Sequence, residues 1–172
     1  MIAASIALFV GAATSTLGGS LVAELRVVNA TAAPIWLAID GAKPVRLATI
    51  AAETPDAGLA LRVFRGRHEL VVTTDDGTRV DARTERLAGG DVYLYVPGPT
   101  EQCFWVQHDA YGETRAELPP LLALENGPLF TLPRAIDAWF FPNPAPSAVD
   151  RTSSGGTRTA VRMARCGLPP WR

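Results

Sequence analysis

Apolar and polar residues alternate at a period of two through most of the chain after residue 24, which is the pattern of half-buried β-strands. Ile35, Leu37 and Ile39, for example, share one face of a predicted strand that ends at the turn residues Asp40 and Gly41. The same alternation predicts strands over residues 25–27, 35–39, 45–47, 59–63, 68–72, 78–87, 92–96 and 103–108. About eight short strands, with no long helical pattern among them, predict an all-β fold, an antiparallel, Greek-key-like sandwich.

One predicted strand carries charges where the others carry apolar residues. Arg79, Asp81, Arg83 and Glu85 alternate along residues 78–87 and therefore point the same way. A row of alternating charges is typical of a solvated face or of a sheet edge that is protected against further pairing.

The chain begins with an uncharged segment. Residues 1–23 contain no Asp, Glu, Lys, Arg or His, and as a helix they would extend about 34 Å, enough to cross the hydrocarbon core of a bilayer. Gly11, Ser15 and Gly19 would then share one helix face, with the spacing at which small residues let membrane helices pack closely. The alternative is a signal peptide whose apolar run is residues 2–10.

Either interpretation of residues 1–23, as a membrane anchor in the form of an N-terminal hydrophobic helix or as a signal peptide, places the rest of the chain outside the cytoplasm. We predict a location in the cell envelope, on the extracytoplasmic face of a membrane. If the segment is cleaved, the protein is predicted to be periplasmic or secreted.

Prolines accumulate towards the C-terminus. Nine of the 14 prolines follow residue 112, which argues against a continuous helix or sheet there. We therefore predict a β-sandwich over residues 24–112 and a Pro-rich arm over residues 113–172. Within the arm, the pattern predicts a short helix over residues 134–140 and a final strand over residues 157–166.

The two cysteines, Cys103 and Cys166, match no CxxC redox or zinc pattern. In an exported chain we expect them to form one disulfide that ties the arm to the sandwich. The alternative is two unrelated buried thiols.

The net charge of −1 excludes a strong overall attraction to nucleic acid, so no nucleic-acid partner is predicted. The cations are almost all arginine, because Lys43 is the only lysine.

Two segments resemble the PEGA-type surface domains of bacteria. Residues 25–41 end in the sequence IDG, and residues 66–72 read GRHELVV. PEGA-type domains pass from a first strand through a short V-x-V-D-G strand to a G-x-H-x-L-x-V strand. The resemblance covers about residues 24–98 and implies an extracytoplasmic interaction module without catalytic residues.

Four aromatic residues lie opposite the aliphatic residues of their own strands: Trp36, Tyr93, Tyr95 and Trp105. Aromatic side chains on an outer face are candidates for binding a carbohydrate or another ligand. The alternative is that the C-terminal arm covers them.

His108 and Asp109, with Ser153 or Ser154, have the residue types of a nucleophilic triad, but no G-x-S-x-G turn accompanies the serines. We predict no catalytic residue, no cofactor and no metal site. The predicted function is that of a non-enzymatic, membrane-associated interaction domain, with other subunits of a membrane complex as partners. The alternative is a secreted carbohydrate- or ligand-binding module that uses the aromatic residues.

Overall fold

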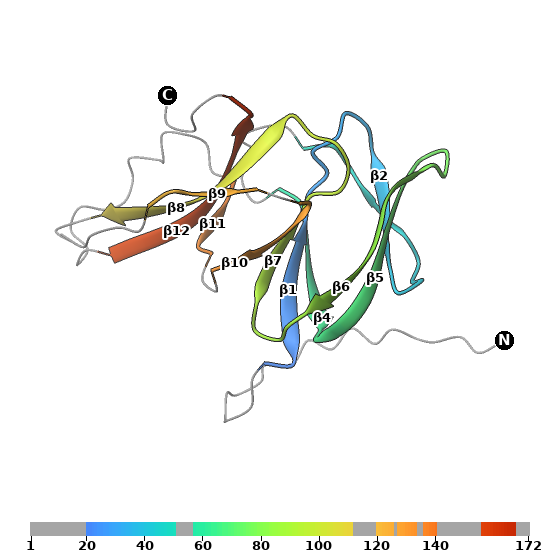
Figure 1. The fold of residues 1–172 in the computed structure, drawn as a ribbon, viewed down its shortest axis with the longest axis horizontal. Helices are drawn as coiled ribbons and strands as arrows, with labels where there is room; N and C mark the ends of the chain where they lie inside the picture. The colour runs from blue at the N-terminus through green and yellow to red at the C-terminus, as the bar shows by residue number, and fades with distance from the viewer. Residues whose placement is uncertain are drawn as a thin grey trace.

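The computed structural model describes residues 20–50, 57–111, 120–125, 127–133, 136–140 and 156–167, which form twelve strands and no helix (Figure 1). The strands are β1 (Val22–Val27), β2 (Ile35–Ile39), β3 (Val45–Leu47), β4 (Leu59–Phe64), β5 (Gly66–Thr74), β6 (Arg79–Leu87), β7 (Val92–Tyr95), β8 (Gln102–Tyr111), β9 (Leu122–Leu124), β10 (Leu129–Leu132), β11 (Ala138–Trp139) and β12 (Gly156–Arg165). The all-β prediction is confirmed. The strands predicted before residue 112 correspond to β1 to β8, and the predicted final strand corresponds to β12.

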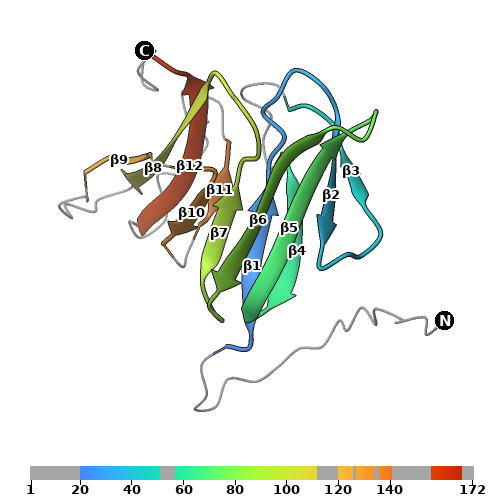
Figure 2. The same ribbon diagram turned by 45° about the vertical axis from the view of Figure 1, so that its right-hand side comes forward.

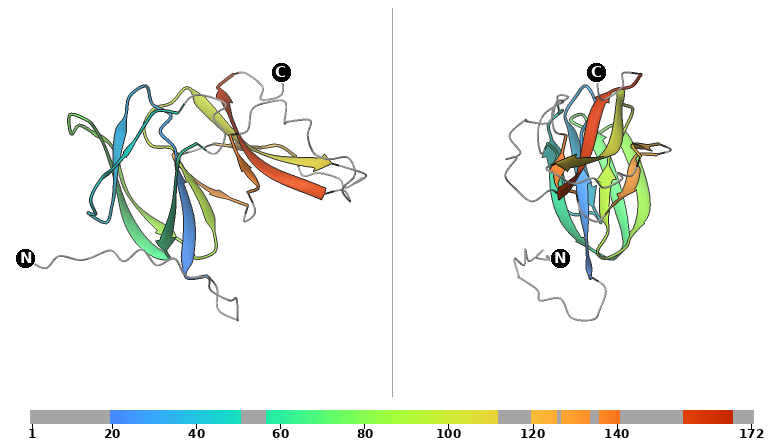
Figure 3. Two further views of the ribbon diagram at one scale, coloured as in Figure 1. Left: turned by 180° about the vertical axis from the view of Figure 1, so that it is seen from behind. Right: turned by 90° about the vertical axis from the view of Figure 1, so that its left-hand side faces the viewer.

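The strands form three sheets, which we name A, B and C. Sheet A has the order β10-β7-β1-β4, sheet B the order β3-β2-β5-β6, and sheet C the order β11-β12-β8-β9. Sheet A lies between the other two, as Figures 1 and 3 show. A first core, which includes Leu25 and Leu70, fills the space between sheets A and B. A second core, which includes Leu94 and Val161, joins sheets A and C. The described residues therefore form three layers, where the alternation predicted two.

β7 is buried on both of its faces. Val92 and Leu94 belong to the second core, whereas Tyr93 and Tyr95 belong to the first. Because neighbouring residues of a strand point to opposite faces, this short strand contributes to both cores at once.

Two pairs of strands run parallel, where the sequence predicted an antiparallel fold. β1 is paired in parallel with β7, and β11 with β12. The first pairing follows from the path of the chain. β6, in sheet B, ends close to the start of β1 in sheet A. In the turn that follows β6, Gly90 donates its N–H to the carbonyl oxygen of Val22. β7 therefore starts beside the start of β1 and runs in the same direction.

The C-terminal part of the chain contributes to two sheets. β10 pairs with β7 at the edge of sheet A, and β12 pairs with β8 along ten residues. The helix predicted over residues 134–140 is wrong for its described part, residues 136–140. Ala138 and Trp139 form β11 beside Ala160 and Val161, and both are buried, so pairing with β12 prevails over local helix preference.

The predicted N-terminal helix, with Gly11, Ser15 and Gly19, lies outside the described residues. Within the described part of the chain, no helix is long and apolar enough to cross a membrane.

The predicted disulfide between Cys103 and Cys166 is confirmed, with the two Cα atoms 4.9 Å apart. It lies at the end of the β8–β12 ladder, where Cys103 is opposite Ala164. Beyond the ladder, Cys166 donates its N–H to the carbonyl oxygen of Glu101 at 2.8 Å. The bond therefore closes the end of sheet C covalently.

We expect the double variant Cys103→Ser/Cys166→Ser to unfold more easily than the wild type. A cross-link between residues separated by 63 positions restricts the unfolded chain, and its loss costs about 4 kcal/mol by loop-closure entropy. Urea unfolding with and without reductant measures the change. Reductant should destabilise the wild type and leave the double variant unaffected, whereas equal stability of the two oxidised proteins would contradict the expectation.

Candidate functional site

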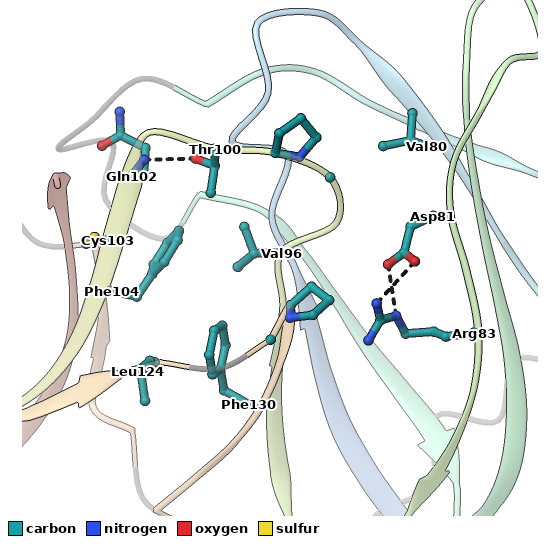
Figure 4. A pocket seen from close by; sticks show the side chains of 14 residues that line it. Val80, Asp81, Arg83, Val96, Thr100, Gln102, Cys103, Phe104, Leu124 and Phe130 are labelled. Carbon is teal, nitrogen blue, oxygen red and sulfur yellow. Dashed lines mark hydrogen bonds and ion pairs between the residues drawn. The ribbon is translucent and has the colours of Figure 1, made fainter.

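A groove of about 500 Å³ opens beside β6, the last strand of sheet B, and faces the start of β8 and the β9–β10 connection (Figure 4). Three stretches distant in the sequence surround it: β6, the β7–β8 turn with the start of β8, and the segment from β9 to β10. We refer to it below as the groove.

The side of the groove formed by β6 is charged. The Asp81 carboxylate accepts two hydrogen bonds from Arg83, from Nε at 2.9 Å and from Nη2 at 3.2 Å. It also accepts a hydrogen bond from the Tyr95 hydroxyl at 2.8 Å. Arg83 Nη1 lies 3.5 Å from a carboxylate oxygen of Glu85, and the guanidinium lies 5.8 Å from the centre of the Tyr95 ring. These groups therefore form one connected polar cluster.

Pairing with β5 turns this charged side inward, because Asp81 and Arg83 are opposite Val72 and Leu70, which are buried in the first core. A β-bulge beyond Asp81 lets Val80 face the same way. The register between β5 and β6 shifts so that Val72 is opposite Asp81 while Thr73 is opposite Arg79. Val80, the extra residue, packs against the first core, and Asp81 and Arg83 line the groove beside it. Inward-pointing charges are one way in which proteins protect a sheet edge against uncontrolled pairing. Of the two alternatives predicted for the row of charges, the protected edge describes this part of β6.

The environment of Asp81 keeps it ionised. Burial alone would raise the pKa of Asp81, but the hydrogen bonds from Arg83 and Tyr95, together with the charge of Arg83, outweigh burial and lower the pKa below its ordinary value of 3.8. Burial and the hydrogen bond to Asp81 raise the pKa of Tyr95. At neutral pH Asp81 is therefore a carboxylate, and Tyr95 is a neutral hydroxyl that donates to it.

The opposite side of the groove is apolar. Val96, Phe104 and Phe130 lie together across the hollow from Asp81 and Arg83 (Figure 4). All three apolar residues belong to or pack against the second core, so their positions are fixed by that core. The groove thus presents an apolar side and a charged side to whatever enters it.

A glycine allows the turn between β7 and β8 to lie close to β6. Gly98 has a φ of +79°, and a Cβ atom there would lie 2.7 Å from Cγ1 of Val80, so only glycine permits this approach. The same turn is fixed on its other side, because the Thr100 hydroxyl donates to the carbonyl oxygen of Ala30 at 3.2 Å and accepts the N–H of Gln102 at 2.9 Å. The rim of the groove is therefore defined by contacts within the fold.

Two of the predicted binding aromatics are core residues. Tyr93 is 5% exposed and Tyr95 is fully buried, because β7 is covered by sheet B on the face that carries them. The prediction that they contribute to a surface for ligand binding is therefore wrong. Tyr95 nevertheless reaches the candidate site, because its hydroxyl bonds to Asp81.

The two predicted tryptophans are not brought together. Trp36 lies on β2 between Ile35 and Leu37, both of which face the first core, so Trp36 lies on the outer face of sheet B. Trp105 lies on the outer face of sheet C by the same argument, since its neighbours on β8 face the second core. Because sheet A separates sheets B and C, the two residues cannot form a single platform. Trp36 is half-buried, and its Nε1 donates to Asp75 at 2.7 Å.

The residue types of the nucleophilic triad are likewise not assembled among the described residues. His108 and Asp109 are neighbours on β8, so their side chains point to opposite faces. His108 Nδ1 lies 3.0 Å from the Thr159 hydroxyl, whereas Asp109 accepts a hydrogen bond from Gln107. Residues 153 and 154 lie outside the described part of the chain. In that described part, no group of three or more His, Cys, Asp and Glu side chains could hold a metal ion.

Most of the groove was not identified from the sequence. Val80 and Phe104 lie in predicted strands, whereas Phe130 lies in the predicted Pro-rich arm, and only the fold brings these segments together. The one available signal was the charged face of residues 78–87, because charges on alternate positions of an otherwise apolar protein require partners or solvent. Cys103, predicted for its disulfide, also lines the groove.

Comparisons of this chain with protein-family models, with curated proteins and with solved structures find no match. The resemblance to PEGA-type domains therefore stays a prediction that rests on the two short motifs. Function has to be inferred from the groove and the surface themselves.

We expect Asp81→Asn to destabilise the protein by about 1–2 kcal/mol at pH 7, because the amide cannot replace the charge that Arg83 is bonded to. Since the folded pKa of Asp81 is lowered, the stability it contributes is present above the unfolded pKa of about 3.9 and is lost as the pH falls through the folded pKa. The difference between wild type and variant should therefore shrink between about pH 5 and pH 2. Urea unfolding at several pH values measures it.

Glu85→Gln is the matched control for this experiment. Glu85 lies on the same strand and, among the residues that the structure describes, its carboxylate makes only the 3.5 Å contact with Arg83, so its replacement should change the free energy of unfolding by about 0.5 kcal/mol or less. A difference between wild type and Asp81→Asn that is as large at pH 2 as at pH 7 would contradict the assigned role of the carboxylate.

Proposed function

We propose that this chain is a non-enzymatic interaction domain on the extracytoplasmic side of a membrane, and that its groove receives an extended segment of a partner protein. A partner of this kind would be another subunit of a membrane complex. The observation that carries the proposal is the groove itself, with an apolar side and a charged side along a sheet edge.

The groove matches the requirements of an extended segment. Side chains of such a segment point alternately to two sides, so one set would contact Phe104 and Phe130 while the other reaches Asp81 and Arg83. β6 is the last strand of sheet B, so among the described residues no strand pairs with its outer edge. An extended peptide can bind such an edge as an additional strand. Its backbone hydrogen bonds then provide affinity, and pockets for its side chains provide specificity.

The chemistry of the groove favours binding over catalysis. Its carboxylate, guanidinium and phenol are hydrogen-bonded to one another, and burial and pairing keep Asp81 ionised and Tyr95 neutral at physiological pH. Cys103 also lines the groove, but it is held in a disulfide and therefore has no free thiol. A general base or nucleophile needs a pKa near the working pH, and neither Asp81 nor Tyr95 meets that requirement.

The proposed location depends on two features of the sequence. Residues 1–23 carry no charged side chain, which is typical of an anchor or a signal peptide. The Cys103–Cys166 disulfide supports the same location, because structural disulfides persist in oxidising compartments and are rare in the cytosol.

Site-specific photo-crosslinking in native membranes tests the proposal. The photoreactive residue p-benzoylphenylalanine replaces Pro99, an exposed residue at the rim of the groove, or Pro133, an exposed residue after β10 that does not line it. Both positions lack a backbone N–H, so neither replacement removes a hydrogen-bond donor. We expect irradiation to give a discrete protein adduct from position 99, several-fold stronger than from position 133.

Mass spectrometry of the adduct then identifies the cross-linked peptide. A single short segment of one envelope protein is the expected result. Equal labelling from positions 99 and 133, or a diffuse set of adducts, would show that the groove is not a protein-binding site.

A further inference from the structure

The end of the molecule at which β1 begins has a defined position for the incoming chain, and we call it the entry end. Arg65 donates its N–H to the carbonyl oxygen of Leu21 at 2.8 Å, and Gly90 donates to that of Val22 at 2.8 Å. Gly89 approaches so closely that a Cβ atom there would lie 1.6 Å from the carbonyl oxygen of Ser20. β1 therefore starts beside the ends of β4 and β6 and the start of β5, as Figure 2 also shows.

The entry end exposes two large apolar side chains. Phe64 is 71% exposed and Leu21 is 56% exposed, and their backbones are adjacent through the bond between Arg65 and Leu21. Phe64 points away from the first core because Leu61 and Val63 occupy the inward face of β4 with alternating spacing. An aromatic side chain exposed to this degree has no packing role within the described fold.

Four exposed arginines lie at this end of the molecule. Arg62 and Arg65 flank Phe64 in the chain, whereas Arg67 and Arg86 lie on the outer face of sheet B. Arg67 and Arg86 are directly opposite each other on β5 and β6, and like charges in that position destabilise a sheet unless an anion lies near them. Arg62 is directly opposite Glu24, yet within the described residues none of the four arginines lies within 4.0 Å of a carboxylate.

The other acidic groups near the entry end are Glu69 on β5, Glu85 on β6, Asp40 and Asp91, and Glu85 lies 3.5 Å from Arg83. Asp40 is bonded to His68 and to the backbone N–H of Glu69, and Asp91 lies close to the Tyr93 hydroxyl. The positive charge of the four arginines is therefore not neutralised by ion pairs within the described fold, in contrast to Arg46 and Arg165, which pair with carboxylates elsewhere.

We propose that the entry end docks on a membrane surface of anionic phospholipid. Phe64 and Leu21 insert at the level of the headgroups, and the four arginines contact the phosphates. Amphipathic surfaces with aromatic and cationic side chains bind such membranes by apolar burial and electrostatic attraction together. This docking rests on the membrane location in the proposed function, and it adds the face of the domain that meets the bilayer.

Two further observations favour a bilayer as the occupant. The uncharged segment that precedes β1 joins the fold at this end, so a membrane that held this segment would lie next to Phe64. The groove is at the other end of sheet A, because β7 begins beside the start of β1 and the rim of the groove follows the end of β7. A domain docked by its entry end would present the groove away from the bilayer.

Lipid-quenching fluorescence of the full chain tests the docking. Phe64→Trp places a reporter at the entry end, and Leu122→Trp places a matched reporter at an exposed position on β9. Each protein is reconstituted with vesicles of phosphatidylcholine alone or with about 30% phosphatidylglycerol, with and without a doxyl-labelled lipid. The spectrum of the parent chain is subtracted to remove its own tryptophans.

We expect the doxyl lipid to quench the reporter at position 64, but not the reporter at position 122, in vesicles that contain phosphatidylglycerol. The double variant Arg67→Gln/Arg86→Gln should weaken docking about 25-fold, since each arginine near an anionic surface contributes about fivefold. Arg79→Gln is the control, because Arg79 is an exposed arginine at the other end of β6. It should leave the quenching unchanged.

The outcomes separate docking from membrane location. If the chain stays on both kinds of vesicle in high salt but the reporter at position 64 is not quenched, the docking surface is wrong and the membrane location survives. If high salt abolishes the quenching and releases the chain from the vesicles, the docking surface is supported and the case for a membrane anchor is removed. A blue shift of the position-64 reporter without quenching by lipid identifies a protein, such as a second copy of this chain, as the occupant and overturns the proposal.

Discussion

The burial of β7 on both faces is the constraint on which the remainder of the molecule depends. Strands of antiparallel sheets commonly have one buried and one solvated face, whereas Val92 and Leu94 contact one core and Tyr93 and Tyr95 the other. Loss of either outer sheet would expose half of this strand to water. The two cores are therefore coupled through one short stretch of backbone, and the three sheets are expected to fold as a unit.

The same strand positions both sides of the groove. Tyr95 spans the first core and bonds to Asp81 on β6, so the charged side is attached to the middle layer. Val96 follows directly and joins Phe104 and Phe130 on the apolar side. Because both residues are adjacent on one backbone, a change in the packing of either core would alter the shape of the groove.

Much of the strand structure was predictable from the sequence, but its layering was not. Alternation identified β1 to β8 and β12, and the two cysteines identified their disulfide. Alternation cannot distinguish Tyr93 on an exposed face from Tyr93 under a second layer, because both give the same periodic pattern. The inward direction of Asp81 depends on its pairing with the buried Val72 of β5, and the inward direction of Val80 depends on a bulge that no local pattern marks. Short strands such as β11 depend on pairing with a distant partner, and local preference for a helix is weaker than that pairing.

The position of β1 within sheet A has a mechanical consequence. β1 is flanked by β4 on one side, over six pairs, and by β7 on the other, over four pairs. Hydrogen bonds in such ladders run across the strands, so a pull on residue 20 along the strand direction loads both ladders in shear. Bonds loaded in shear must break together, whereas bonds at a peeled edge break one after another. A chain that enters through a central strand thus resists force applied from its N-terminal side better than a chain that enters through an edge.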